Sequence, residues 1–114
     1  MEKQIICAAS FYERKYFFDP QFENFPEQAK IELRALCGSA AETIRGIFCV
    51  GYYDGGSVFF EARGHENDGM FDEIGAKITT EALTKQKAEL IGSLRMYYKL
   101  YKTADGEKIR GMLK

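Results

Sequence analysis

Acidic side chains gather between residues 61 and 73, together with the single histidine of the chain. Carboxylate oxygens suit hard divalent cations, and carboxylates beside aromatic rings suit a small-molecule pocket. The spacing does not fit an EF-hand calcium loop, and no zinc-type His/Cys pattern is present. The more ordinary interpretation is that these acids cap a helix and lie at its positive end. The candidate ligand-binding residues are Glu61, His65, Asp68, Asp72, Tyr12 and Tyr16, and we assign no metal ligand and no cofactor.

The three cysteines, Cys7, Cys37 and Cys49, each lie in an apolar run. An odd number of cysteines, without CxxC spacing or an export signal, argues against a disulfide framework. We therefore expect three buried thiols that pack as small hydrophobic side chains. A nucleophilic cysteine needs a base nearby, and nothing in the sequence places His65 beside a thiol. We assign no catalytic residue and expect a protein that is not an enzyme, although an active site shared between two subunits stays open.

Charge and hydropathy exclude two classes of partner. Sixteen basic and seventeen acidic residues give a net charge of −1, which offers no electrostatic case for nucleic acid. The glycines Gly51, Gly55 and Gly56 do not form a phosphate-binding loop. No apolar run is long enough to span a membrane, and the run at residues 5–9 is too short for a secretory signal. We expect a cytoplasmic protein with neither nucleic acid nor membrane as a partner.

A β-hairpin must position these residues. Two β-rich runs, residues 47–53 and 57–62, flank Asp54-Gly55-Gly56, a strong hairpin signal. With Asp54-Gly55 as the turn, Glu61 lies on an apolar face opposite Phe48, whereas a turn at Gly55-Gly56 shifts the register by one partner. Both faces of the hairpin are largely apolar in either register, so we expect a helix, a symmetry mate or a second subunit to cover each face.

Helical patterns follow on both sides of the hairpin. Residues 26–44 carry an apolar stripe at helical spacing, and residues 81–103 form a long amphipathic helix. Met70, Phe71, Ile74 and Ile78 also repeat at helical spacing, and a break at Thr79-Thr80 stays open. Residues 4–18 fit either strand or helix, with strand preferred at residues 5–9.

These elements predict an α+β fold with a small, mostly antiparallel sheet built on the central hairpin and covered by two main helices, in the order β-α-β-β-α. Residues 1–103 form the single domain, and residues 104–114 form a flexible tail.

The chain carries more apolar surface than so short a domain needs. Two apolar hairpin faces and a last helix with apolar residues on two sides indicate a non-enzymatic protein-interaction module, acting as a homodimer or with a protein partner. The small-molecule or divalent-metal site at residues 61–73 and the aromatic N-terminal segment is the alternative. The candidate interface residues are Phe48, Val50, Tyr52, Phe59, Tyr97, Tyr98 and Tyr101.

Short motifs extend along most of the chain. They are Ala9-Ser10, Tyr12-Glu13, Lys15-Tyr16-Phe17-Phe18, Phe25-Pro26, Glu32-Leu33 with Cys37, Gly46-Ile47, Asp72-Glu73-Ile74-Gly75, Lys87 with Glu89-Leu90, and Tyr97-Tyr98-Lys99. In this order they resemble a small family of uncharacterised proteins from clostridia and related Firmicutes, although the run after Cys37 is smaller and richer in Gly and Ser. The resemblance implies a cytoplasmic bacterial protein and supplies no catalytic residue.

Overall fold

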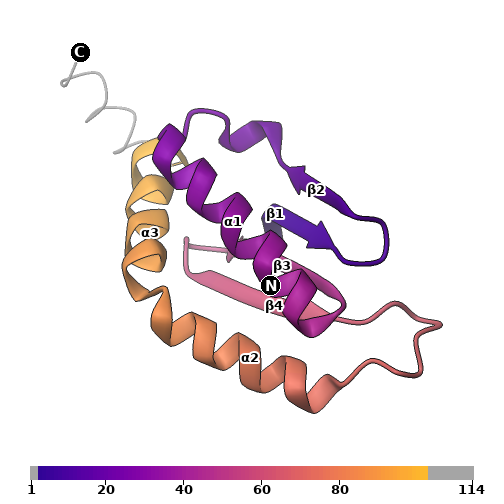
Figure 1. The fold of residues 1–114 in the computed structure, drawn as a ribbon. Coiled ribbons are helices and arrows are strands. Elements are labelled where there is room, and N and C mark those ends of the chain that lie inside the picture. Colours follow the sequence, from indigo (N-terminus) through magenta and orange to yellow (C-terminus); the bar gives the residue numbers. More distant parts are fainter. Residues whose placement is uncertain (1–2, 103–114) are drawn as a thin grey trace.

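The computed structural model describes residues 3–102, which form one four-stranded antiparallel sheet with its helices on one side (Figure 1). In chain order the elements are β1 (Lys3–Ser10), β2 (Lys15–Phe18), the 3-10 helix η1 (Pro20–Phe22), α1 (Glu27–Ile44), β3 (Ile47–Tyr53), β4 (Val58–Arg63), α2 (Glu73–Gln86) and α3 (Ala88–Lys102). The strands lie in the order β2-β1-β3-β4. The predicted α+β class is confirmed, and the predicted tail at residues 104–114 lies outside the described residues.

The first two strands pair as a second hairpin, within the region that fitted either strand or helix. The element order is therefore β-β-α-β-β-α-α instead of the predicted β-α-β-β-α. The connecting turn contains no glycine or proline, and Arg14 adopts a left-handed backbone with φ of 55°. An irregularity in the β1–β3 pairing between Ile5 and Cys7 places Ile6 and Cys7 consecutively in the core.

The central hairpin has a register that differs from both predicted ones. Asp54, Gly55 and Gly56 form a three-residue loop, in which the Gly56 N–H donates to the Tyr53 carbonyl at 3.1 Å and the Tyr53 N–H to the Ser57 carbonyl at 2.8 Å. Gly55 and Gly56 both have positive φ, which explains why glycine occupies these positions. Glu61 consequently pairs with Cys49 rather than with Phe48. The prediction that Glu61 shares a face with Phe48 is therefore wrong.

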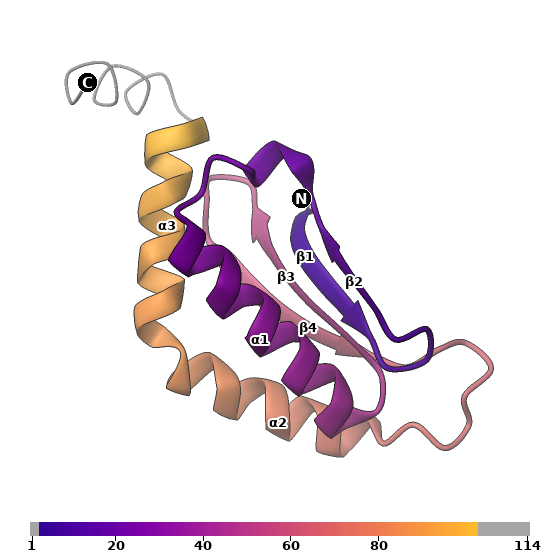
Figure 2. The ribbon, with the colours of Figure 1, turned by 45° about the horizontal axis from the view of Figure 1, so that its top comes forward.

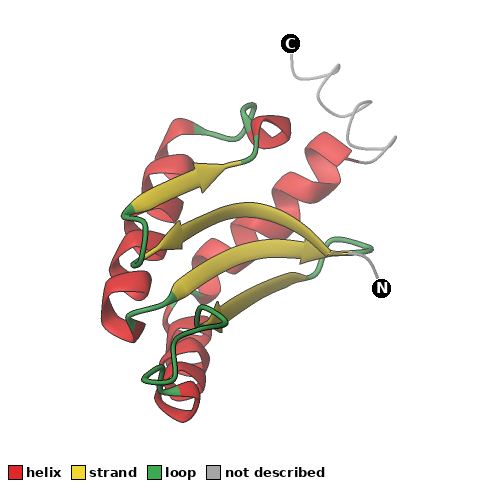
Figure 3. Ribbon diagram, turned by 90° about the vertical axis from the view of Figure 1, so that its right-hand side faces the viewer, coloured by secondary structure: helices red, strands yellow, loops and turns green. Residues whose placement is uncertain are grey.

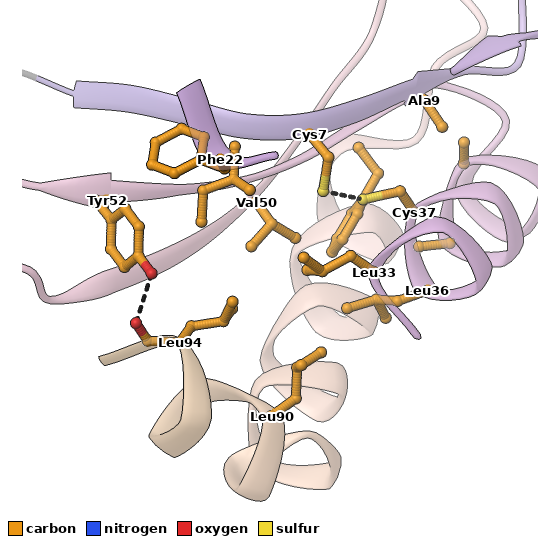
Figure 4. Close-up of a cluster of buried hydrophobic side chains, with 14 of the residues drawn as sticks. Cys7, Ala9, Phe22, Leu33, Leu36, Cys37, Val50, Tyr52, Leu90 and Leu94 are labelled. Carbon is orange, nitrogen blue, oxygen red and sulfur yellow. Dashed lines mark hydrogen bonds between the residues drawn. The ribbon is translucent and has the colours of Figure 1, made fainter. Parts of the chain in front are cut away.

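The hydrophobic core lies between the sheet and its helices (Figure 4). Alternate residues of β3, Phe48, Val50 and Tyr52, are at most 1% exposed and face this layer. Helix α1 packs on β1 and β3 and contributes Leu33 and Cys37, which are fully buried. No charged side chain is buried among residues 3–102, so the core supplies hydrophobic stabilisation without buried charges.

The opposite face of the sheet carries no helix among residues 3–102 (Figure 3). Among residues 3–102 a helix covers only one face of the hairpin, and cover of the other face by a second subunit stays a prediction. Phe59 shields this other face, because its ring lies across Gly51 so closely that a Cβ at Gly51 would meet the Phe59 Cζ at 2.7 Å. On this face Phe59 is only 7% exposed and Cys49 only 3%. The Lys3 ammonium lies over the Phe59 ring, 5.2 Å from its centre.

The last two helices turn a corner around the sheet (Figure 2). Helix α2 continues through Thr79-Thr80, where the Thr80 hydroxyl donates to the Ala76 carbonyl, and the chain bends at Lys87. The predicted continuous helix over residues 81–103 is therefore wrong. The bend lets α2 pack on β4 while α3 buries Leu90 and Leu94 at another part of the core. A straight helix of this length cannot follow that curved surface.

Candidate functional site

Three of the predicted ligand-binding residues meet where the β1–β2 turn lies beside the loop that precedes α2 (Figure 2). The Tyr12 hydroxyl donates to the Asp68 carboxylate at 2.6 Å and accepts from the backbone N–H of His65 at 3.1 Å. The Tyr12 and His65 rings meet edge to face, with centres 5.5 Å apart. Of the six candidate ligand-binding residues, the structure thus brings Tyr12, His65 and Asp68 together.

The hydrogen bonds of this cluster hold the loop before α2 in place. One Asp68 oxygen binds the Tyr12 hydroxyl, and the other accepts from the Met70 N–H at 3.0 Å. Because the carboxylate stabilises the phenol proton, the pKa of Tyr12 is raised. The cluster therefore ties the loop at residues 64–72 to the first hairpin, and both oxygens of the carboxylate are already engaged.

The other predicted members lie elsewhere. Glu61 points to the open face and pairs with Lys3 at 3.4 Å. Asp72 caps the start of α2, accepting from the Gly75 N–H at 2.9 Å. Tyr16 packs against the hydrophobic core on the helix side of the sheet, and burial raises its pKa. In the part of the chain that the structure describes, no group of three or more His, Cys, Asp or Glu side chains is arranged to hold a metal ion.

The thiols are buried, as the sequence predicted. The sulfur atoms of Cys7 and Cys37 lie 3.3 Å apart between β1 and α1 (Figure 4). This contact and burial raise the pKa of Cys37, and burial raises the pKa of Cys49 on the other side of the sheet. Raised pKa values disfavour the reactive thiolate, so these cysteines have the character of core residues.

The predicted interface residues pack within the chain. Phe48, Val50 and Tyr52 lie under the helices, and Phe59 covers the open face. The three tyrosines of α3 form an aromatic cluster with Phe25, which precedes α1, and with Tyr52 of β3. Tyr97 and Tyr101 pack on Phe25, and Tyr98 packs edge to face on Tyr52 with ring centres 5.0 Å apart. These side chains are half-buried, so the accessible apolar surface lies elsewhere.

The most exposed part of that surface lies on α2 and in the loop just before it. Met70, Ile74 and Ile78 are 92%, 75% and 63% exposed, and Ala82 one turn further is also exposed. We call these four residues the α2 stripe. The sequence predicts the helical spacing of these residues but not their exposure, and Ala76 and Leu83 on the other side of α2 contact the core. The signal for their exposure is this second apolar stripe, because one helix seldom buries two faces.

A groove of about 470 Å³ runs between β4 and α2. Consecutive residues of the strand and the loop after it form one wall, and one side of α2 forms the other. We call it the edge groove, and its lining residues are Phe60, Glu61, Ala62, Arg63, Gly64, Phe71, Glu73, Lys77, Thr80 and Glu81. The groove is not apparent from the sequence, because it depends on how α2 packs beside the sheet edge.

A family model, described as a family of unknown function (DUF6145), matches residues 3–107. The chain belongs to the DUF6145 family. The match includes all strands and helices described above, and it confirms the expected membership of a family without an assigned activity. No curated protein and no solved structure matches the chain. None of the described helices of this DUF6145 member is long and apolar enough to cross a membrane.

Proposed function

We propose that this DUF6145 protein is a protein-interaction module that self-associates through the α2 stripe. The observation that carries the proposal is the exposure of Met70, Ile74 and Ile78, large apolar side chains gathered on and beside one helix. Fully burying a side chain of this kind stabilises a complex by about 1.5–3 kcal/mol. A contiguous apolar patch on a small domain is characteristic of an interaction site.

The spacing of the stripe suits a second copy of the chain. Consider two antiparallel α2 helices related by a twofold axis that crosses the exposed side of α2 at the level of residue 76. This arrangement sets Ile74 of one copy against Ile78 of the other. The same symmetry brings Met70 towards Ala82, both of which are exposed. A twofold interface requires such self-complementarity, because one patch must fit itself.

The helix dipoles also suit this arrangement, because the dipoles of two antiparallel α2 helices are opposed. The patch is small, so we expect association in the micromolar range.

The test is light scattering coupled to size exclusion over a concentration series. We expect the mass of the wild-type protein to rise towards a dimer and the double variant Ile74→Glu/Ile78→Glu to stay monomeric. The control is Ile31→Glu/Met96→Glu, which adds the same charge at two exposed apolar residues of α1 and α3. A wild-type protein that is monomeric throughout, or a control that dissociates equally, would disprove self-association through the stripe.

The alternative, a small-molecule or divalent-metal site at residues 61–73, has less support. Its best location is the cluster of Tyr12, His65 and Asp68, where the Asp68 carboxylate already accepts two hydrogen bonds. Glu61 and Asp72 are engaged separately with Lys3 and Gly75. We therefore favour the interaction module, in which this cluster anchors the loop next to the α2 stripe.

A further inference from the structure

The outer edge of β4 is a second surface, and its backbone N–H and C=O groups have no partner strand among residues 3–102. β4 is an end strand of the sheet, so every second residue directs its backbone N–H and C=O away from β3. Among residues 3–102, no strand pairs with this edge and no backbone hydrogen bond from a loop reaches it. Unpaired edges of this kind are templates for another extended chain.

Natural sheets usually protect such an edge with proline, a bulge or a covering element. β4 spans six residues, contains no proline and pairs with β3 in an unbroken register. Its charged residues, Glu61 and Arg63, share a face with Cys49 and so stand on the open side of the sheet, not across the edge. Helix α2 packs on β4, and the edge groove between them is lined by residues 60–64 of this strand and the loop after it.

The shape of the groove selects an extended polypeptide. Residues 60–64 form one continuous wall, about 13 Å long at the rise of a β-strand. The facing wall comes from α2, with Glu73, Lys77 and Thr80 at helical spacing. We propose that the edge groove binds an extended segment of a partner protein, which joins the sheet as a fifth strand beside β4. This inference extends the interaction role to a new surface and does not depend on self-association.

A second copy of this chain is a poor occupant. Two β4 strands paired edge to edge would lie about 4.8 Å apart. Each would carry an α2 helix packed on it, and packed helices need axes about 8–10 Å apart. A single extended segment without a helix attached meets no such conflict, which favours a peptide-like partner.

The lining residues define the side chains that the partner segment must carry. Phe60 and Ala62 lie on the helix side of β4, and Phe71 extends this half-buried apolar floor. Alternate residues of the added strand point to this floor, so they should be apolar and of moderate size. The residues between them point to the open side near Glu61 and Arg63, where polar side chains of either charge fit.

The experiment is selection of a random peptide display library on the full chain, followed by calorimetry of the selected peptides. We expect binders with apolar residues at alternate positions. Thr80→Arg, which fills the groove, should weaken binding at least tenfold. Thr84→Arg is the matched control, because both threonine hydroxyls donate to the carbonyl four residues earlier in α2 but only Thr80 lines the groove.

A second measurement needs no protein variant. Methylating alternate backbone nitrogens of a selected peptide removes the N–H groups that would pair with β4, and one of the two alternating sets should abolish binding. The inference is overturned if no peptide is selected, if Thr84→Arg weakens binding as much as Thr80→Arg, or if neither methylated set matters. Ile74→Glu/Ile78→Glu should leave peptide affinity unchanged, so failure of this inference and failure of self-association are distinguishable.

Discussion

At the scale of single residues, two glycines in different elements have opposite roles. A Cβ at Gly51 would lie 2.5 Å from the Gln4 carbonyl oxygen and 2.7 Å from the Phe59 ring, so glycine permits β1 and Phe59 to approach β3 closely. A Cβ at Gly38, in the middle of α1, would meet no atom within 4 Å. The first glycine is required by packing, whereas the second only weakens its helix.

We expect Gly51→Ala to destabilise the protein by about 1–3 kcal/mol, because the backbone of β1 must move to accept the methyl group. Gly38→Ala should stabilise it by about 0.5–1 kcal/mol, because alanine restricts the unfolded chain and favours the helix. Urea unfolding monitored by circular dichroism measures both changes. Equal effects of the two substitutions would contradict the role given to Phe59 and Gly51.

At the scale of elements, one tyrosine joins β3 to α3. The Tyr52 hydroxyl donates to the Leu94 carbonyl (Figure 4), and burial raises the pKa of Tyr52. Since the folded pKa lies above that of the unfolded chain, the stability it confers is complete below about pH 10 and falls as the pH rises further.

Near neutral pH, Tyr52→Phe should therefore lower the free energy of unfolding by about 1 kcal/mol, because the variant lacks the hydrogen bond to Leu94. When the pH rises from about 8 to about 11, the free energy of unfolding of the variant should also fall less than that of the wild-type protein. Urea midpoints at the two pH values test this, with Tyr53→Phe on the open face as the control. A wild-type pH dependence that Tyr52→Phe leaves intact would assign the alkaline destabilisation to other groups.

The elements also show what the sequence can reveal. The central hairpin was predictable because Gly55 and Gly56 mark a turn, but a three-residue loop shifts the pairing by one. The first hairpin was not predictable as such, because Arg14 rather than glycine takes the positive φ. The bend at Lys87 has no proline or glycine and arises from packing on two parts of the sheet. In the candidate site, Tyr12 and Asp68 meet only because the first hairpin folds beside the loop before α2. Glu61 was predicted on the wrong face, because the register of the central hairpin differs from the predicted one.

At the scale of the whole molecule, the thiols lie on both sides of the sheet. Cys7 and Cys37 are fully buried in the helix layer, and Cys49 is 3% exposed on the open side. Because the three thiols are buried on opposite sides of the sheet, we expect their reaction with a thiol reagent to require global unfolding.

We expect mass spectrometry during slow maleimide labelling to show chains with no label or three labels, and few in between. Denatured protein, which should label fully at once, is the control. An accumulating species with one label would reveal that one face of the sheet opens independently, most simply at Cys49.

The aromatic cluster between Phe25, Tyr52 and α3 should give the packing of α3 a near-ultraviolet circular dichroism signal of its own. The chain has no tryptophan, and four of its seven tyrosines, Tyr52, Tyr97, Tyr98 and Tyr101, lie in this cluster or on α3 beside it. Tyrosines held in asymmetric surroundings produce near-ultraviolet circular dichroism, which vanishes when packing loosens while far-ultraviolet helicity persists. Comparing the two spectral regions therefore separates the undocking of α3 from the loss of the entire fold.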